Sequence, residues 1–320
     1  IDKGSISSIN EKWTLTTPLP QLEQEVPESF RLLLERQSAS LTTEEQQLLS
    51  AASIVGLEFS AAAVAAIVES EVILVEEQCE ELARRRLFIH PTGASEWPNG
   101  ERTARYTFHH ALLREAWSAR LSPARRQRLH LNFGKCLEAT YLHREEEVAA
   151  ELALHFTEGR DLSRAIHYHS IAGEKTNRQL AYHEAISHFS QAMALLDSLP
   201  PSRKRSAQEL RLHLALAIPL TATKGWAATE TWRAYSRAHE LSRQVGSFAE
   251  QCATLCGLWV GAYTRAELDA AHDLAQQLFH IAKRSRAPEL QMKAHHMLGN
   301  TLHRLGQLPT AREHLEQGIQ

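Results

Sequence analysis

The chain has 320 residues, of which 43% are hydrophobic and 23% charged, so it can bury a sizeable core and is long enough for two domains. Its formal net charge of −3 at pH 7 excludes a general electrostatic attraction for nucleic acid or for an anionic membrane. The sequence opens with no signal-peptide pattern and has no apolar stretch long enough to span a bilayer, so we expect a cytoplasmic protein. Gly and Pro are sparse while Ala, Leu, Glu, Arg and Gln abound, which favours a mainly α fold.

Residues 1–26 are polar and weakly periodic, and Pro18 and Pro20 follow a short extended piece. We interpret this stretch as a linker at the edge of a preceding domain, because a chain that begins with Ile1 rather than Met is expected to be a fragment. A helical pattern starts at Pro27, since proline is favoured at the first helical position.

The stretch 27–120 is predicted to form a winged-helix domain. A capping box at Thr42–Glu45 starts one helix, which Gly56 ends. A second helix is expected over 59–68 with Ser60 as its N-cap. A third is expected over 71–86, with four residues facing inward: Ile73, Leu74, Cys79 and Leu82.

The hydrophobic period then changes. Two short runs, 87–90 and 104–108, are predicted to be strands, and the turn residues between them fit a hairpin with a long tip. Three helices followed by such a hairpin are typical of a winged helix. A connecting helix over 121–144 follows, starting at Ser122 and Pro123.

Residues 145–320 show only helical periods and are predicted to form a right-handed solenoid of tetratricopeptide (TPR)-like repeats. The clearest hairpin is 294–318. The small residues Gly299, Ala311 and Gly318 allow two helices to approach closely, Leu315 fills the seam, and Gly306 provides the turn. An earlier hairpin repeats this spacing with Ala185, Phe189 and Ala192.

An aromatic enrichment lies between residues 226 and 263, in a chain that is only 7% aromatic. Core packing explains most of these side chains. The functional interpretation is a groove for a protein or small-molecule ligand on the concave face of the solenoid. The residues proposed for that groove are Trp226, Trp232, Tyr235, Trp259 and Tyr263.

Five stretches of the sequence resemble bacterial signalling ATPases of the STAND class: 26–30, 41–53, 106–117, 150–156 and 222–226. In that family, an AAA-like nucleotide-binding module precedes a winged helix and a TPR-like superhelix. A transcriptional regulator or a nucleotide cyclase is often attached as the output domain. The resemblance implies that His110, the match in the family's Phe-x-His-x-Leu pattern, contacts bound nucleotide. The alternative is that His110 only caps the following helix.

No Gly-x-x-x-x-Gly-Lys-[Ser/Thr] motif occurs in the chain, and Gly134-Lys135 lies in a predicted helix. We therefore expect no catalytic residues and no cofactor in these residues, with ATP or ADP and Mg²⁺ bound only by the full-length protein. The chain is interpreted as a non-catalytic sensor segment whose winged helix couples to an intramolecular ATPase module. A stand-alone TPR scaffold and a DNA-binding transcriptional regulator are the alternatives.

Metal and DNA sites are not expected. No two of the 18 histidines are three or four residues apart, the spacing that places two ligands on one helical face. The four cysteines form no Cys-x-x-Cys pair. Direct DNA contact is disfavoured because the third helix of the winged-helix unit is acidic, with Glu71, Glu76, Glu77, Glu80 and Glu81.

Overall fold

The protein is mainly helical and divides into two compact units. The computed structural model describes residues 6–9, 12–15, 37–97, 100, 102–284 and 287–318. Unit 1 comprises Ile1–Glu145 with His155–Arg160, and unit 2 comprises Glu146–Leu154 with Asp161–Gln320. Most of the helix expected over 27–37 lies outside the described residues. None of the described helices combines the length and the hydrophobicity that a bilayer-spanning helix requires.

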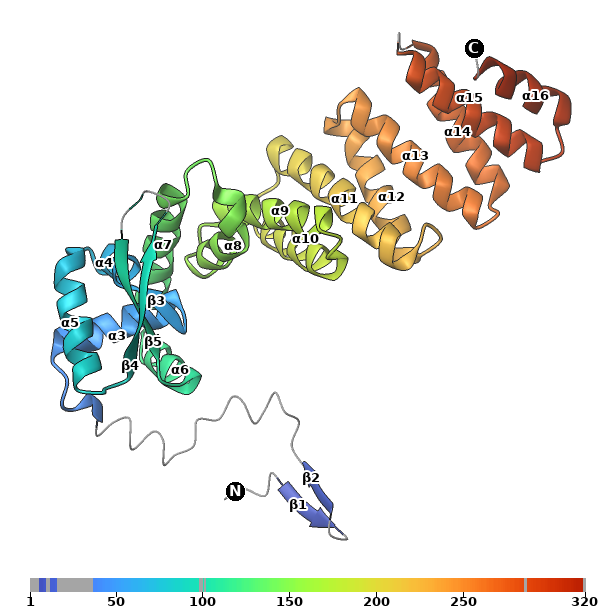
Figure 1. Ribbon diagram of the computed structural model, residues 1–320. Coiled ribbons are helices and arrows are strands. Elements are labelled where there is room, and N and C mark those ends of the chain that lie inside the picture. Colours follow the sequence, from blue (N-terminus) through green and yellow to red (C-terminus); the bar gives the residue numbers. More distant parts are fainter. Residues whose placement is uncertain are drawn as a thin grey trace. The chain divides into compact units, whose positions relative to one another are not determined.

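Unit 1 begins with a two-stranded antiparallel pair and continues with three helices, a three-stranded sheet and two further helices (Figure 1). The first pair is β1 (Ile6–Ile9) and β2 (Lys12–Leu15). The following elements are α3 (Thr43–Val55), β3 (Glu58–Ser60), α4 (Ala61–Val68), α5 (Val72–Arg84), β4 (Ile89–Glu96), β5 (Arg102–Phe108), α6 (Ala111–Ala119) and α7 (Pro123–Thr140).

The sheet of unit 1 has the antiparallel order β3-β5-β4. Its first strand was not expected from the sequence, and the prediction that Phe59 starts a helix is wrong. Phe59 lies in β3 opposite Tyr106, and the helix begins only after Ser60, whose side chain accepts a hydrogen bond from the backbone N–H of Ala63. The second strand, expected over 87–90, runs to Glu96 with a register shift between Pro91 and Gly93.

The helix α5 presents a different face from the one expected. Val75, Cys79 and Leu82 are buried, whereas Ile73 and Leu74 are 57% and 48% exposed. The placement of Ile73 and Leu74 inside is therefore wrong. The run Val72–Val75 is apolar at every position, so it does not fix the phase of the helix, which is set instead by the spacing of the three buried residues.

Unit 2 is built from antiparallel helical hairpins of the TPR-like kind, each packed mainly on its neighbours in the chain (Figure 1). A 3₁₀ turn (Glu145–Val148) precedes α8 (Ala149–Glu158), whose residues are divided between the two units. The remaining helices are α9 (Leu162–Arg178), α10 (Tyr182–Asp197), α11 (Arg203–Lys224), α12 (Thr229–Val245), α13 (Phe248–Thr264), α14 (Leu268–Arg284), α15 (Pro288–Arg304) and α16 (Leu308–Gln317).

Three of these hairpins share one turn. Leu180, Ala266 and Gly306 occupy the same place between the helices, and their φ angles are 62°, 59° and 78°. In each turn the next backbone N–H donates to the carbonyl five residues earlier, at 2.9 Å. Only Gly306 indicates this left-handed conformation in the sequence, because leucine and alanine rarely adopt it.

The packing predicted for hairpin α15/α16 is present. A Cβ atom on Gly299 would lie 2.7 Å from Leu315 Cγ, so glycine is required for the observed approach of the helices. Ala311 is 1% exposed. Gly318 contributes less, since an added Cβ would meet its nearest neighbour, His295 Cβ, only at 3.4 Å.

Candidate functional site

His110 lies at the N-terminus of α6, directly after β5. The backbone N–H of Leu112 donates to His110 Nδ1 at 3.1 Å, so the side chain caps the helix and is exposed. Because Nδ1 accepts this hydrogen bond, the neutral imidazole carries its proton on Nε2. The cap therefore leaves an N–H donor at the outer edge of the ring, which can face an anionic group.

His109, the neighbouring residue, has a different partner. Its Nδ1 lies 3.1 Å from Nδ1 of His90 on β4, and the two rings stack with centroids 4.9 Å apart. Partial burial, and then the neighbouring His90, lower the pKa of His109. This pair ties the two ends of the β4/β5 hairpin together beside His110.

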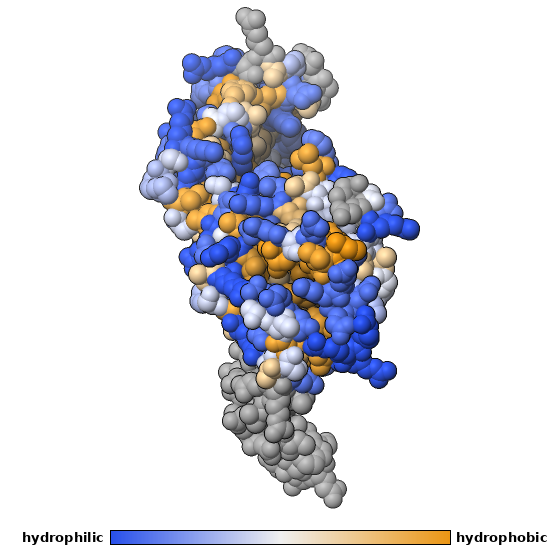
Figure 2. All heavy atoms as spheres, turned by 90° about the vertical axis from the view of Figure 1, so that its left-hand side faces the viewer, coloured by the Kyte–Doolittle hydropathy of each residue, from blue (hydrophilic) through white to orange (hydrophobic). Residues whose placement is uncertain are grey.

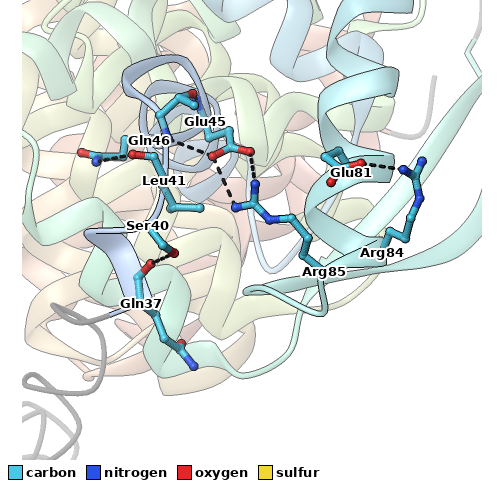
Figure 3. Close-up of polar contacts among 9 residues, drawn as sticks. Gln37, Ser40, Leu41, Glu45, Gln46, Glu81, Arg84 and Arg85 are labelled. Atoms are coloured by element: carbon cyan, nitrogen blue, oxygen red, sulfur yellow. Dashed lines mark hydrogen bonds and ion pairs between the residues drawn. The ribbon is translucent and has the colours of Figure 1, made fainter.

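The acidic helix α5 uses several of its charges within unit 1. Glu76 Oε1 accepts a hydrogen bond from the backbone N–H of Ala104 at 2.9 Å, which fixes α5 against β5. At the other end of α5, Arg85 donates to Glu45 of α3 at 2.9 Å, and Arg84 pairs with Glu81 (Figure 3). Arg84 and Arg85, at the basic end of α5, thus pair with carboxylates of the protein and not with the phosphates of a nucleic acid.

The start of α5 leaves hydrophobic surface uncovered. Leu57, just before β3, is 43% exposed, in addition to Ile73 and Leu74. Hydrophobic side chains are visible among hydrophilic ones on the side of the protein where α5 lies (Figure 2). Unit 1 therefore combines an exposed apolar region with the exposed His110.

The aromatic residues of unit 2 fall into two groups. In the first group, Trp226 stacks on Tyr235 at a centroid distance of 5.8 Å. Tyr235 and Trp232 also pack on α13, where Cβ atoms on Gly257 and Gly261 would lie 2.2 Å and 3.2 Å from their rings. These rings consequently fix the approach of α12 to α13, as the packing interpretation expects.

The second group lies on α13 and α15. Trp259 is only 8% exposed, and its indole N–H donates to the Thr301 hydroxyl at 2.9 Å. Its ring stacks on Tyr263, with centroids 4.9 Å apart. The guanidinium carbon of Arg304, an exposed residue, lies 4.4 Å from the Tyr263 ring centroid.

A second arginine covers the first group. The guanidinium carbon of Arg265 lies 3.9 Å from the centroid of Trp232, and Glu267 accepts two hydrogen bonds from this side chain at 2.9 and 3.0 Å. We call Trp226, Trp232, Tyr263, Arg265 and Arg304 the aromatic–arginine surface. Cation–π contacts of this kind attract a guanidinium to the face of the ring, by about 0.5–1 kcal/mol at exposed sites.

Sequence reasoning missed a set of histidine pairs. His130 faces His155, His169 faces His188, and His295 faces His314, each through two Nδ1 atoms at 2.9–3.1 Å. The search for histidines three or four residues apart concerned metal ligands on one helical face, whereas these pairs join two helices. A signal was present: a histidine stands four residues before a glycine in each first helix.

The described residues contain no group of three or more His, Cys, Asp or Glu side chains that could hold a metal ion. Cys79, Cys252 and Cys256 are free thiols. Burial raises the pKa of Cys79 to about 12, with a further contribution from Glu76. A thiol in this environment is poorly suited to nucleophilic chemistry.

A scan of protein-family models found no match to this chain, and a search of curated proteins found none. Solved structures of TPR-like proteins are similar in fold. BtubC (BKLC) from P. vanneervenii is 14% identical, with a TM-score of 0.46 over 62% of this chain and 81% of that chain. Aspartyl phosphate phosphatase F from Bacillus subtilis is 12% identical, with a TM-score of 0.45 over 65% of this chain and 55% of that chain.

A third similar structure is a STAND protein with a tetratricopeptide repeat sensor, PH0952 from Pyrococcus horikoshii. It is 12% identical to this chain, with a TM-score of 0.44. The match covers 93% of this chain and 53% of that chain, so the present chain spans about half of the longer protein. At such identities the likeness concerns the fold alone.

Proposed function

We propose that the chain is a non-catalytic sensor segment of a cytoplasmic signalling ATPase. In this proposal unit 2 binds a protein partner through the aromatic–arginine surface, and unit 1 transmits the state of an intramolecular nucleotide-binding module. ATP and Mg²⁺ would bind that module. Gly134-Lys135 does not serve as a phosphate loop, because Gly134 lies inside α7 with Phe156 3.1 Å from the place of a Cβ.

The aromatic–arginine surface is the observation that carries the proposal. Tyrosine, tryptophan and arginine are the residues that most often dominate binding energy at protein interfaces. Here two guanidinium groups are held over aromatic rings, at 3.9 and 4.4 Å, so less side-chain entropy is lost when a partner binds. The positive charge of the exposed Arg304 and the flat rings together suit a peptide segment that bears both a carboxylate and an aromatic side chain.

The interpretation of unit 1 as a winged helix is supported by its element order, from α3 to β5, and by its antiparallel sheet. The nucleotide-sensing role of His110 is supported by the Nε2–H donor that its helix cap leaves exposed. The exposed Leu57, Ile73 and Leu74 offer apolar area for the nucleotide-binding module.

Partner binding is tested by selecting a random peptide library on the full chain and on two variants. Arg304→Glu reverses a charge of the aromatic–arginine surface. Arg312→Glu is the matched control, because Arg312 is an exposed arginine on the next helix, paired with Glu316. Selected peptides should lose at least about tenfold in affinity with Arg304→Glu, which corresponds to about 1.4 kcal/mol, and bind the control normally. Equal binding to both variants would remove the proposed site.

The signalling role is tested separately from partner binding. An in-frame Gly-x-x-x-x-Gly-Lys-[Ser/Thr] motif in the coding sequence that precedes residue 1 is expected. The present chain alone should show no saturable heat with millimolar ATP and Mg²⁺ in calorimetry. A micromolar nucleotide site in this chain would contradict the assignment of nucleotide binding to another module.

DNA binding by the same samples distinguishes the sensor role from that of a DNA-binding regulator. Since Arg84 and Arg85 are paired with carboxylates, we expect only weak, salt-sensitive binding to duplex DNA, near the nonspecific range of about 10⁻⁴ M. Fluorescence anisotropy at about physiological salt measures this directly. Nanomolar, sequence-specific binding would favour DNA regulation over the sensor role.

A further inference from the structure

Two hairpins of unit 2 are joined by matching histidine pairs. In α9/α10, His169 and His188 place their Nδ1 atoms 3.1 Å apart, and in α15/α16, His295 and His314 place theirs 3.0 Å apart. The sequence separation is 19 residues in both pairs. The ring planes are inclined by similar angles, 46° and 44°.

The pairs occupy equivalent positions in the two hairpins. The first histidine stands four residues before Gly173 in α9 and four before Gly299 in α15. The second histidine directly precedes the residue that covers this glycine, Phe189 in α10 and Leu315 in α16. The two pairs therefore occupy the same position relative to the helix crossing in both hairpins.

Hairpin α13/α14 provides an internal comparison. It has the same turn, but Leu255 and Leu274, again 19 residues apart, stand at the two histidine positions. Leu255 is fully buried and Leu274 packs on the same core. This hairpin has the geometry of its neighbours without a titratable pair.

The distance between the nitrogens limits how many protons a pair can hold. Two Nδ1 atoms 3.0–3.1 Å apart share one hydrogen bond, in which one ring donates N–H and the other accepts. When the accepting nitrogen is protonated, two N–H groups point at one another and the hydrogen bond is lost. Each pair is therefore compatible only with rings that are neutral or share a single Nδ1 proton.

The surroundings of both pairs favour the neutral rings. Burial, and then the neighbouring His188, lower the pKa of His169 to about 4. Burial also lowers the pKa of His188, although Glu184 of the same helix acts in the opposite direction.

Around the second pair, Phe279 of α14 packs edge-on against both rings, with centroids 5.0 and 5.4 Å away. Burial lowers the pKa values of His295 and His314, and Glu313 opposes the shift at His314. Glu184 and Glu313 are thus the charged groups that oppose the lowered pKa values in the two pairs.

We propose that the two histidine pairs are acid-sensitive latches that hold α9/α10 and α15/α16 closed near neutral pH and release them on acidification, while α13/α14 stays closed. The direction follows from linkage. A histidine whose pKa is about 6.5 unfolded and lowered in the fold contributes stability that is complete above pH 6.5. For His169 that contribution is lost as the pH falls from about 6.5 toward about 4.

Hydrogen exchange of the full chain at pH 7.5 and pH 5.0 tests the latches, after correction for intrinsic exchange rates. Peptides from α9/α10 and α15/α16 should lose at least about tenfold in protection relative to α13/α14, because one unit of pKa corresponds to a factor of ten. An acid effect that is equal in the three hairpins would overturn the proposal.

Variants assign the effect to the pair. His169→Leu combined with His188→Leu gives α9/α10 the pair that α13/α14 carries, so α9/α10 should become acid-resistant while α15/α16 still opens. His167→Leu is the matched control, because His167 is an exposed histidine of the same helix. Acid opening of α9/α10 that persists in the double variant contradicts the latch.

A measurement on the unaltered chain decides the question even if the double variant does not fold. Side-chain ¹⁵N spectra at neutral pH distinguish the two neutral tautomers of each histidine. Each pair should contain one ring with its proton on Nδ1 and one with its proton on Nε2. If both rings carried the proton on Nε2, no Nδ1–H···Nδ1 hydrogen bond could form, which would contradict the latch.

Discussion

Hairpins α9/α10 and α13/α14 are packed alike, but the large side chain at the helix crossing lies on the second helix in α9/α10 and on the first helix in α13/α14. Both have a left-handed turn residue and a fully buried alanine early in the second helix, Ala185 and Ala271. In α9/α10 the contact is made by Gly173 on the first helix and Phe189 on the second. At the equivalent places α13/α14 has Trp259 and Ala275.

This exchange shows what the hairpin constrains. The summed volume at the crossing must fill the space between the helices, because interiors are packed to nearly constant density. Either helix can supply the large side chain. The choice has consequences beyond the hairpin, since Trp259 on the first helix reaches Thr301 of α15, whereas Phe189 covers its own partner helix.

Removing the large side chain should have the largest effect. Phe189 is 1% exposed and faces a glycine, so Phe189→Ala leaves a cavity that no neighbouring side chain fills. We expect a loss of about 3–5 kcal/mol in local stability, measured by hydrogen exchange in α9/α10. Phe248→Ala is the control, since Phe248 is 46% exposed and should change stability by less than about 0.5 kcal/mol. Similar losses in both variants would contradict the packing role of Phe189.

A larger side chain at Ala311, which corresponds to Ala185 and Ala271 in the other hairpins, should have the next largest effect on stability. Ala311 is 1% exposed, so Ala311→Leu forces α15 and α16 apart and should cost about 1–3 kcal/mol. Because each repeat contacts mainly its neighbours, exchange should increase within residues 265–318 and not within 42–120.

Thr310→Leu is the control for Ala311→Leu, because Thr310 is exposed and has room for the larger side chain. Protection lost equally in both units would mean that the chain unfolds as one cooperative body.

Substitutions in the turns should change the stability of their hairpins less, and in opposite directions. Gly306→Ala places an alanine at φ 78° and should destabilise α15/α16 by about 1 kcal/mol. Ala266→Gly relieves the same strain in α13/α14, where φ is 59°, and should stabilise that hairpin slightly. Thermal unfolding and hydrogen exchange measure both changes. A destabilising Ala266→Gly would show that the strained turn is held by other contacts.

Much of the helical architecture could be predicted from the sequence because its signals are local. The capping box at Thr42, the N-cap at Ser60 and the turn at Gly306 each depend on a few consecutive residues. Strand β3 could not be predicted, since three residues show no period and its partner, β5, lies more than forty residues later.

The candidate site could be predicted only in part. The sequence identifies the aromatic residues and His110, but the arginines over Trp232 and Tyr263 come from outside the aromatic pattern. The turns at Leu180 and Ala266 lack the glycine that would indicate them. The histidine pairs of α9/α10 and α15/α16 become visible only when two helices are aligned across a turn, because their members are 19 residues apart.

Gly173→Ala, made in two backgrounds, tests whether the two helices of α9/α10 share the volume at their crossing. In the natural chain the new Cβ would lie 2.6 Å from the Phe189 ring, so the substitution should destabilise α9/α10 by about 1–3 kcal/mol. With Phe189→Ala already present, the clash is gone and Gly173→Ala should stabilise the helix by up to about 1 kcal/mol. The measurement is the local opening free energy from hydrogen exchange in this double-mutant cycle. If the volume is shared, the effect of Gly173→Ala changes sign between the two backgrounds. An effect of the same sign and size in both would show that the volumes at 173 and 189 are independent.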